Sequence, residues 1–199
     1  VNIDLTGKGG HAAYPQDAND TIVAAAMLIS QVQTVISRSI DPIQSAVVTL
    51  GKIDGGTIRN VIAGHTRIEG TIRGLTQKMI ETIDQRLKDI CEGIGRSYNM
   101  TVNLELNQGG YWPVENNPKL TKRFISYMES TPNVNFIETA PAMTGEDFGF
   151  LLAKFPGTMF WLGVDDDSQL HSATLKPKEE AIQRGVDAIT GFLEYRMTE

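Results

Sequence analysis

Four short stretches of the first 110 residues have the pattern of β-strands. Residues 1–6 place Val1, Ile3 and Leu5 between polar neighbours, which predicts a half-buried strand. Further strands are expected at 45–50, which is apolar and β-branched, and at 67–73 and 102–106, which alternate.

Two long helices are expected between these strands. The first begins near Asp17 or Asn19, either of which is a good N-cap, and the second is capped by Thr76. Residues at helical spacing form one apolar face on each, with Gln33 as the polar exception: Ile22, Ala26, Ile29, Gln33 and Ile36 on the first, and Ile80, Ile83, Leu87, Ile90 and Ile94 on the second. The order βαββαβ is the ferredoxin-like pattern, in which two helices cover one face of a sheet whose other face is open.

The pattern changes after Gly109-Gly110, where a linker-like passage rich in Pro and Asn follows. Expected elements beyond it are a helix at 119–130, a short strand near Phe136, a short helix at 148–154, a buried strand at 159–164 and a helix from about Pro177. This part has few strands of its own. We therefore predict an α/β (α+β) chain with one complete domain at 1–110 and the C-terminal segment of a larger domain at 111–199. Because the chain opens with Val1 directly in a strand pattern, we expect it to be a fragment.

Composition narrows the classes of partner. The formal net charge is -6 and no dense basic run occurs, which argues against a nucleic-acid partner. The apolar stretches are short for a membrane span, so no membrane partner is expected, and no signal peptide is visible. Cys91 is the single cysteine, which excludes an internal disulfide and fits a reducing, cytoplasmic location. It lies beside the apolar face of the second helix and is expected at the core or its margin.

Three histidines are candidates for chemistry. His11 lies between a glycine loop and a proline, so it is either a ligand-reaching residue at a strand end or a solvated turn residue. His171 follows the expected buried strand at 159–164, where ligands gather in open α/β sheets; it is either a metal ligand or an ordinary loop residue. His65 follows Gly64 in a turn and is expected to be solvated.

Several acidic and basic residues have two possible interpretations. Glu146 and Asp147 could orient a metal ligand or cap the helix that follows. Asn60 and Arg73 flank a predicted strand, and Arg73 could grip a carboxylate or merely be exposed. The run at 165–167 has three aspartates, for which a surface turn is favoured over a metal cluster.

Five stretches spread over nearly the whole chain resemble one known family. They are GKGGHAAYP at 7–15, VVTLGKIDGGTIRNVI at 47–62, RIEGTIRGL at 67–75, MTGEDFGFLL at 143–152 and LHSATLKPKEE at 170–180. The family is the dinuclear-metal amidohydrolases and peptidases that include aminoacylase, hippurate hydrolase, acetylornithine deacetylase and succinyl-diaminopimelate desuccinylase. Each stretch is moderately specific, whereas all five in the same order are a strong signal.

The resemblance implies a catalytic domain that binds two divalent metal ions, with zinc favoured and cobalt, manganese or nickel as alternatives. It also implies an inserted βαββαβ lid through which a homodimer forms. In that scheme His11 polarises the scissile carbonyl, Asn60 and Arg73 bind the substrate carboxylate, His171 is the last metal ligand and Glu146 supports the site. His11 would act in its own or in the partner's active site.

The implied reaction is hydrolysis of the amide bond of an N-acyl amino acid, with N-acetyl-diaminopimelate of lysine biosynthesis as the favoured substrate. Other N-acyl amino acids such as hippurate are the alternative, as is a non-catalytic dimerisation or binding module. The family's remaining metal ligands and its general base lie upstream of the lid, and nothing here matches them. A single ligand cannot hold two metals, so the fragment alone is expected to bind metal weakly and to be inactive.

Overall fold

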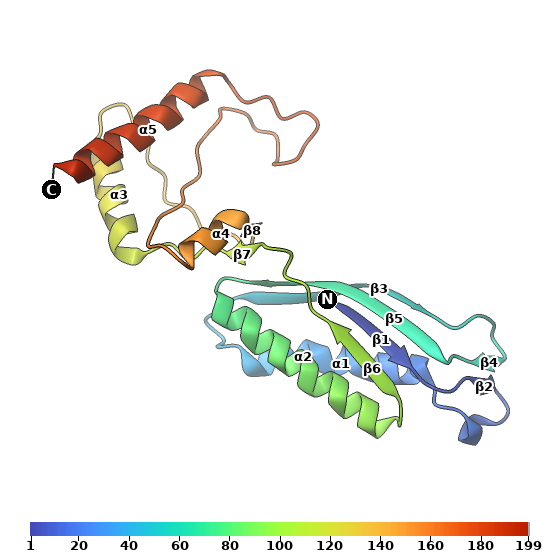
Figure 1. Cartoon of the computed structure of the whole chain (residues 1–199). Coiled ribbons are helices and arrows are strands. Elements are labelled where there is room, and N and C mark those ends of the chain that lie inside the picture. The colour runs from blue at the N-terminus through green and yellow to red at the C-terminus, as the bar shows by residue number, and fades with distance from the viewer. Residues whose placement is uncertain (199) are drawn as a thin grey trace. The chain divides into compact units, whose positions relative to one another are not determined.

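The computed structural model describes residues 1–198, which form two compact units (Figure 1). The first unit comprises Val1–Val114 and Pro141–Phe150, and the second comprises Glu115–Ala140 and the chain from Leu151 onward. The chain therefore leaves the first unit in the linker-like passage, and the segment at 141–150 returns to it.

The first unit is built on a four-stranded antiparallel sheet with the strand order β3-β5-β1-β6. A β-bulge interrupts the β3–β5 ladder between Leu50 and Lys52. Two-residue strands form two further small pairs, β2 with β4 and β7 with β8. The elements of this unit are β1 (Asn2–Thr6), β2 (Gly10–His11), the 3-10 helix η1 (Pro15–Asp17), α1 (Thr21–Ser39), β3 (Ala46–Gly55), β4 (Val61–Ile62), β5 (His65–Gly74), α2 (Gln77–Ser97), β6 (Thr101–Glu105), β7 (Trp112–Pro113), β8 (Gly145–Glu146) and α4 (Asp147–Leu152), which runs past the unit's end at Phe150.

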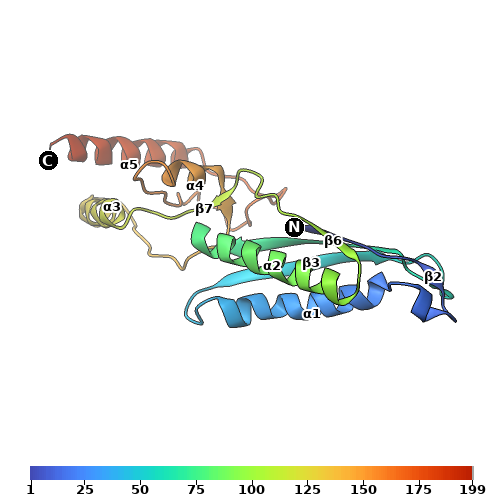
Figure 2. The same ribbon diagram turned by 60° about the horizontal axis from the view of Figure 1, so that its bottom comes forward.

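Helices α1 and α2 cover the same face of this sheet (Figure 2), which confirms the predicted ferredoxin-like architecture. Thr76 caps α2 by accepting a hydrogen bond from the Met79 amide at 3.2 Å, as predicted. The predicted apolar face of α2 is also confirmed, and Cys91 lies in it with 3% exposure. Burial raises the pKa of the Cys91 thiol to about 11, so the thiol stays protonated and packs as a core residue.

The predicted face of α1 is wrong. The helix buries Thr21, Ala24, Ala25, Leu28, Val32 and Val35. Ile22, at the start of the predicted face, is 47% exposed. The cap is Asp20, whose carboxylate accepts from the amides of Ile22 and Val23. By length and composition α1 could cross a membrane, a property that it shares with core helices; its buried face belongs to the core of the first unit.

The open face of the sheet carries a ladder of charged side chains. Arg67 on β5 donates to Asp4 on β1 at 2.7 Å and to Glu69 at 3.1 Å. Lys52 on β3 also pairs with Glu69, and the hydrogen bonds from Lys52 and Arg67 lower the pKa of the Glu69 carboxyl. His65, expected to be solvated, lies 3.2 Å from Asp4 through Nε2, although its side chain is still 57% exposed.

The second unit holds α3 (Pro118–Ser130) and α5 (Glu180–Met197), which contact each other. An aromatic cluster joins them, with the Phe124 and Phe192 rings edge to face at 5.0 Å. The expected strands near Phe136 and at 159–164 do not form among residues 1–198. The reason for the second is that a strand buried on both faces needs neighbouring strands, and this unit supplies none within the described residues.

Helix α5 leaves its apolar face exposed. Its residues recur at the predicted helical spacing, but each is about half exposed or more: Ile182 70%, Val186 48%, Ile189 50% and Leu193 56%. An apolar stripe of this kind normally lies against another element.

Candidate substrate-binding and catalytic site

His11 lies on β2, which pairs with β4 so that His11 is opposite Val61. Its Nδ1 accepts a hydrogen bond from the Ala13 amide at 3.1 Å. In the neutral imidazole the proton is then on Nε2, because a ring nitrogen that accepts cannot also carry it. The exposed ring therefore offers one N–H donor to whatever lies in front of it, which is the property needed to polarise a carbonyl oxygen.

Tight backbone packing holds the glycine loop before His11. The Gly7 amide donates to the Gly64 carbonyl at 2.9 Å. A Cβ on Gly64 would lie 2.9 Å from the Gly9 nitrogen, and a Cβ on Gly7 would lie 2.5 Å from the Asn19 carbonyl oxygen. Both distances are too short for a side chain, so glycine at these positions allows the loop to position His11.

Asn60 is brought beside His11 by the same small sheet. The Ala12 amide donates to the Asn60 carbonyl at 3.1 Å, directly after the His11–Val61 pair. Asn60 is exposed, and its backbone lies next to that of His11 in this small sheet. Tyr14 also lies here, with its ring centroid 5.7 Å from that of His11. Tyr14 was not among the predicted site residues, although an aromatic residue before Pro15 in the same motif was a usable signal.

Arg73 lies at the other end of the sheet. It is the second last residue of β5, whereas His65, at the start of β5, pairs with Thr6 just before the glycine loop. Eight residues of strand separate the two positions, which is about 26 Å at 3.3 Å per residue. The structure therefore brings His11 and Asn60 together but brings neither of them to Arg73 within one chain.

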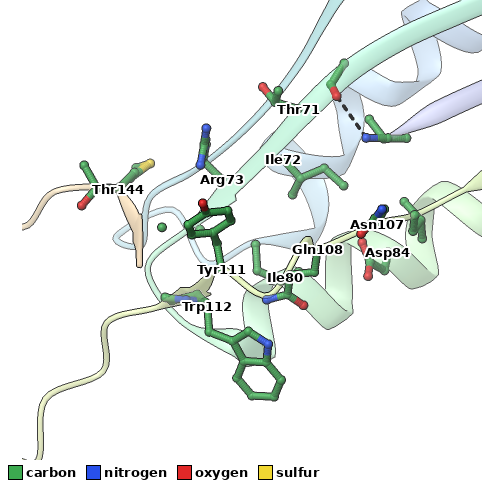
Figure 3. A pocket seen from close by; sticks show the side chains of 17 residues that line it. Thr71, Ile72, Arg73, Ile80, Asp84, Asn107, Gln108, Tyr111, Trp112 and Thr144 are labelled. Atoms are coloured by element: carbon green, nitrogen blue, oxygen red, sulfur yellow. Dashed lines mark hydrogen bonds between the residues drawn. The ribbon is translucent and has the colours of Figure 1, made fainter. Parts of the chain in front are cut away.

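A second group of residues surrounds Arg73 (Figure 3). Tyr111, Thr144 and Gly145 line the same cavity, and an added Cβ on Gly145 would lie 3.6 Å from Arg73 Nη1. Arg73 is exposed and forms no ion pair with any residue from 1 to 198, so its charge is free for a ligand. Sequence reasoning missed Tyr111 because it treated the passage after Gly109-Gly110 as a linker.

Glu146 belongs to the loop that reaches Arg73. It lies on β8 opposite Trp112 on β7, is half-buried, and immediately precedes α4. Asp147 lies in the first turn of that helix, where a negative charge is favourable. The structure thus places Glu146 next to Gly145 and the Arg73 group, and its supporting role stays a prediction.

His171 belongs to the second unit, in an exposed loop with a left-handed backbone (φ 65°). No group of three or more His, Cys, Asp or Glu side chains placed to hold a metal occurs within residues 1–198. The residues present therefore do not fit a dinuclear metal centre by themselves, because each metal needs several ligands.

The acidic run at 165–167 is structural, as the turn interpretation predicted. Asp165 pairs with Arg184 at 2.7 Å, and Asp166 accepts from the amides of Ser168 at 2.7 Å and Lys176 at 3.1 Å. These bonds close the loop that carries His171.

The Asp166 bonds predict how this loop responds to acid. The Ser168 and Lys176 amide donors lower the pKa of the Asp166 carboxyl. The stabilisation is therefore complete above the ordinary aspartate pKa of about 3.9 and is lost as the pH falls through the lower folded value. An NMR titration should give Asp166 a midpoint below 3.9, and Asp166→Asn should accelerate exchange of both amides at neutral pH. A midpoint at or above the ordinary value would contradict the assignment.

Comparisons with known proteins agree with the fold and the motifs. The model of peptidase family M20/M25/M40 matches residues 9–195. The chain is 87% identical over 197 residues to an N-acetyldiaminopimelate deacetylase of Limosilactobacillus reuteri, covering 99% of this chain and 52% of that protein. It is 79% identical over 198 residues to the Lactobacillus helveticus protein of the same name, again covering 52% of it. The chain thus spans about half the length of the curated relatives that it matches.

Solved structures give the same answer for the fold. A protein from methicillin-resistant Staphylococcus aureus, described as an aminohydrolase, matches with a TM-score of 0.85 and 30% identity over 94% of this chain and 49% of its own. The Bacillus subtilis YXEP protein, described as a dinuclear metal binding peptidase from the M20 family, matches with a TM-score of 0.74 and 23% identity, covering 96% of this chain and 47% of its own. The βαββαβ sheet, the motifs around it and the family match together show that the chain belongs to peptidase family M20/M25/M40.

Proposed function

We propose that the full-length protein hydrolyses the amide bond of N-acetyl-diaminopimelate, releasing acetate and diaminopimelate for lysine biosynthesis. The observation that carries this proposal is the 87% identity over 197 residues with a protein named N-acetyldiaminopimelate deacetylase. Because this chain spans about half of that relative, the activity is assigned to the longer protein.

The two residue groups of the first unit suit different parts of such a substrate. The Nε2–H of His11 can donate to the substrate's amide oxygen as that oxygen gains negative charge. Asn60 is adjacent to His11 in the small sheet. The exposed guanidinium of Arg73 can bind the carboxylate next to the scissile amide in a bidentate manner. We assign polarisation of the carbonyl to His11 and binding of the carboxylate to Arg73.

A homodimer reconciles these roles with the separation of about 26 Å along β5. In a twofold dimer, His11 and Asn60 of one chain can complete the active site that contains Arg73 of the other. The flank formed by β3 and α1 fits such an interface, because β3 is an edge strand and contacts α1. Exposed apolar side chains mark this flank: Ile22 47%, Val23 49%, Met27 45%, Val47 43% and Ile53 53%.

The remaining catalytic parts belong to the other half of the protein. We propose that it binds two divalent metal ions, zinc before cobalt, manganese or nickel, and that His171 contributes one ligand. Because residues 1–198 supply no metal-binding cluster, we propose that this chain alone binds, closes and dimerises without catalysis. Cys91 as the single cysteine supports a cytoplasmic location.

A substrate panel tests the proposed function. The full-length protein, loaded in turn with zinc, cobalt and manganese, is assayed for release of the acyl group from N-acetyl-diaminopimelate, N-acetylornithine and hippurate. We expect the highest kcat/KM for the first substrate with at least one metal. A higher value for hippurate would favour the wider N-acyl amino acid hydrolase, and no turnover of any substrate would favour a binding module.

A further inference from the structure

A cavity of about 390 Å³ opens in the first unit where β1 stops but β5, and the chain that follows β6, continue. Val1 and Gly70 exchange two backbone hydrogen bonds, from the Val1 nitrogen to the Gly70 carbonyl at 3.0 Å and back at 2.9 Å. Beyond this pair, β5 continues to Gly74, and the chain after β6 continues through Gln108. The cavity lies between these two segments (Figure 3).

The strand register identifies the residues that would flank an extension of β1. Asn2 on β1 is opposite Glu69 on β5, and the two strands are antiparallel, so Val1 is opposite Gly70. On β6, Asn2 faces Glu105 with the same antiparallel sense. A residue immediately before Val1 would therefore lie between Thr71 and Asn107. The residue before that would lie between Ile72 and Gln108. All four of these residues line the cavity.

The backbone groups along the cavity also match a strand. In an antiparallel ladder every second residue directs its N–H and C=O to the same neighbour. Since Gly70 bonds to Val1, the groups of Ile72 point into the cavity, whereas those of Thr71 and Arg73 point to β3. By the same alternation the groups of Asn107 point into the cavity.

We propose that this cavity is a strand track, and that its occupant is the segment preceding Val1 in the longer protein, which extends β1 between β5 and residues 106–108. The curated relatives are about twice as long as this chain, so such a segment has a source. A small ligand would leave a regular row of strand hydrogen-bonding groups only partly satisfied, whereas a backbone satisfies all of them.

Filling the track redefines the site around Arg73. Side chains on a strand alternate between the two faces, and Ile68 is buried beneath the helices, so Arg73 belongs to the open face. The upstream segment therefore takes the space between the strands and leaves the guanidinium accessible beside Tyr111 and Thr144. Substrate can therefore bind at the cavity entrance on the open face of the sheet, but not in the cavity interior.

Amide hydrogen exchange at single-residue resolution tests this proposal by comparing the 199-residue chain with the full-length protein. We expect the Ile72 and Asn107 amides to exchange at least about 100-fold more slowly in the full-length protein, because each gains a strand hydrogen bond. The Thr71 and Arg73 amides, which are directed to β3, should change by less than about threefold. They are matched internal controls, because a general gain of stability would slow all four amides alike.

A pair of full-length variants separates strand extension from other causes. Proline at both positions preceding Val1 should restore fast exchange at Ile72 and Asn107, because proline lacks the ladder N–H and is excluded from central strands, so the segment no longer pairs and its carbonyls no longer accept from these two amides; alanine at both positions should leave the protection in place. Unchanged exchange at these two amides in the full-length protein would overturn the proposal. So would equal protection of the 199-residue chain by added diaminopimelate, which would make the cavity a ligand pocket.

Discussion

Replacement of His11 by alanine in the full-length enzyme is expected to lower kcat by about 100- to 1,000-fold, which is the usual cost of losing one donor to a developing oxyanion. The reason is geometric. The Ala13 amide occupies Nδ1 at 3.1 Å, so Nε2–H is the donor that the exposed ring directs outward. Because this donor acts most strongly in the transition state, KM should change much less than kcat.

Metal content and fold should be unaffected by His11→Ala. The ring of His11 is exposed and forms no part of the hydrophobic core. His65→Ala is the matched control, because His65 is also an exposed histidine but contacts Asp4 on the sheet; its kcat should stay within about twofold. An unchanged kcat in His11→Ala, with metal content intact, would remove the catalytic role assigned to His11.

The two long helices show how far an apolar pattern can be interpreted. In α2 polar residues separate the apolar ones, so only one face can be buried, and the sequence predicted it correctly. In α1 the run from Ile22 to Ile29 is apolar throughout, so two faces were possible. The choice depends on where the sheet lies, and that is a tertiary property which spacing alone does not contain.

The predictions for the second unit were wrong for a different reason. The stretch at 159–164 has the composition of a buried strand, and α5 has the predicted spacing, yet the stretch is not a strand and the α5 face is exposed. Both patterns describe surfaces that need a partner. Within residues 1–198 the partner strands do not exist, so the local pattern was present without the structure that it normally serves.

The candidate site likewise has a part that local motifs predicted and a part that depends on tertiary structure. Motifs at 7–15 and 47–62 placed His11 and Asn60 in turn-rich segments, and the pairing of β2 with β4 brings their backbones side by side. Arg73 was correctly placed in a strand. Its distance from His11, however, depends on the length and the antiparallel register of β5, and no motif contains either quantity.

The distance between His11 and Arg73 in one chain predicts a second large effect, which is complementation between subunits. Full-length His11→Ala and Arg73→Ala should each be nearly inactive alone, whereas a mixture that has exchanged subunits should recover activity. In a mixed dimer, one active site receives both substitutions and the other receives neither, provided that His11 serves the partner's site. Random pairing of equal amounts makes half of the dimers mixed, so about one quarter of the wild-type activity is expected.

The mixture should be unfolded and refolded together, or coexpressed, so that subunits exchange, and kcat/KM should be measured per total active-site concentration. Arg86→Ala replaces Arg73→Ala in the control mixture, since Arg86 lies on the exposed side of α2 and pairs with Asp89. This control should give about one half of the wild-type activity, because the mixed dimers, half of the total, keep one intact site each, and the quarter without His11→Ala keep both sites. The Arg86 control mixture should therefore be about twice as active as the Arg73 mixture, at about one half against about one quarter of the wild-type activity. Activity of the Arg73 mixture no higher than the mean of its two parents would show that His11 and Arg73 act in the same chain, and would refute the shared site.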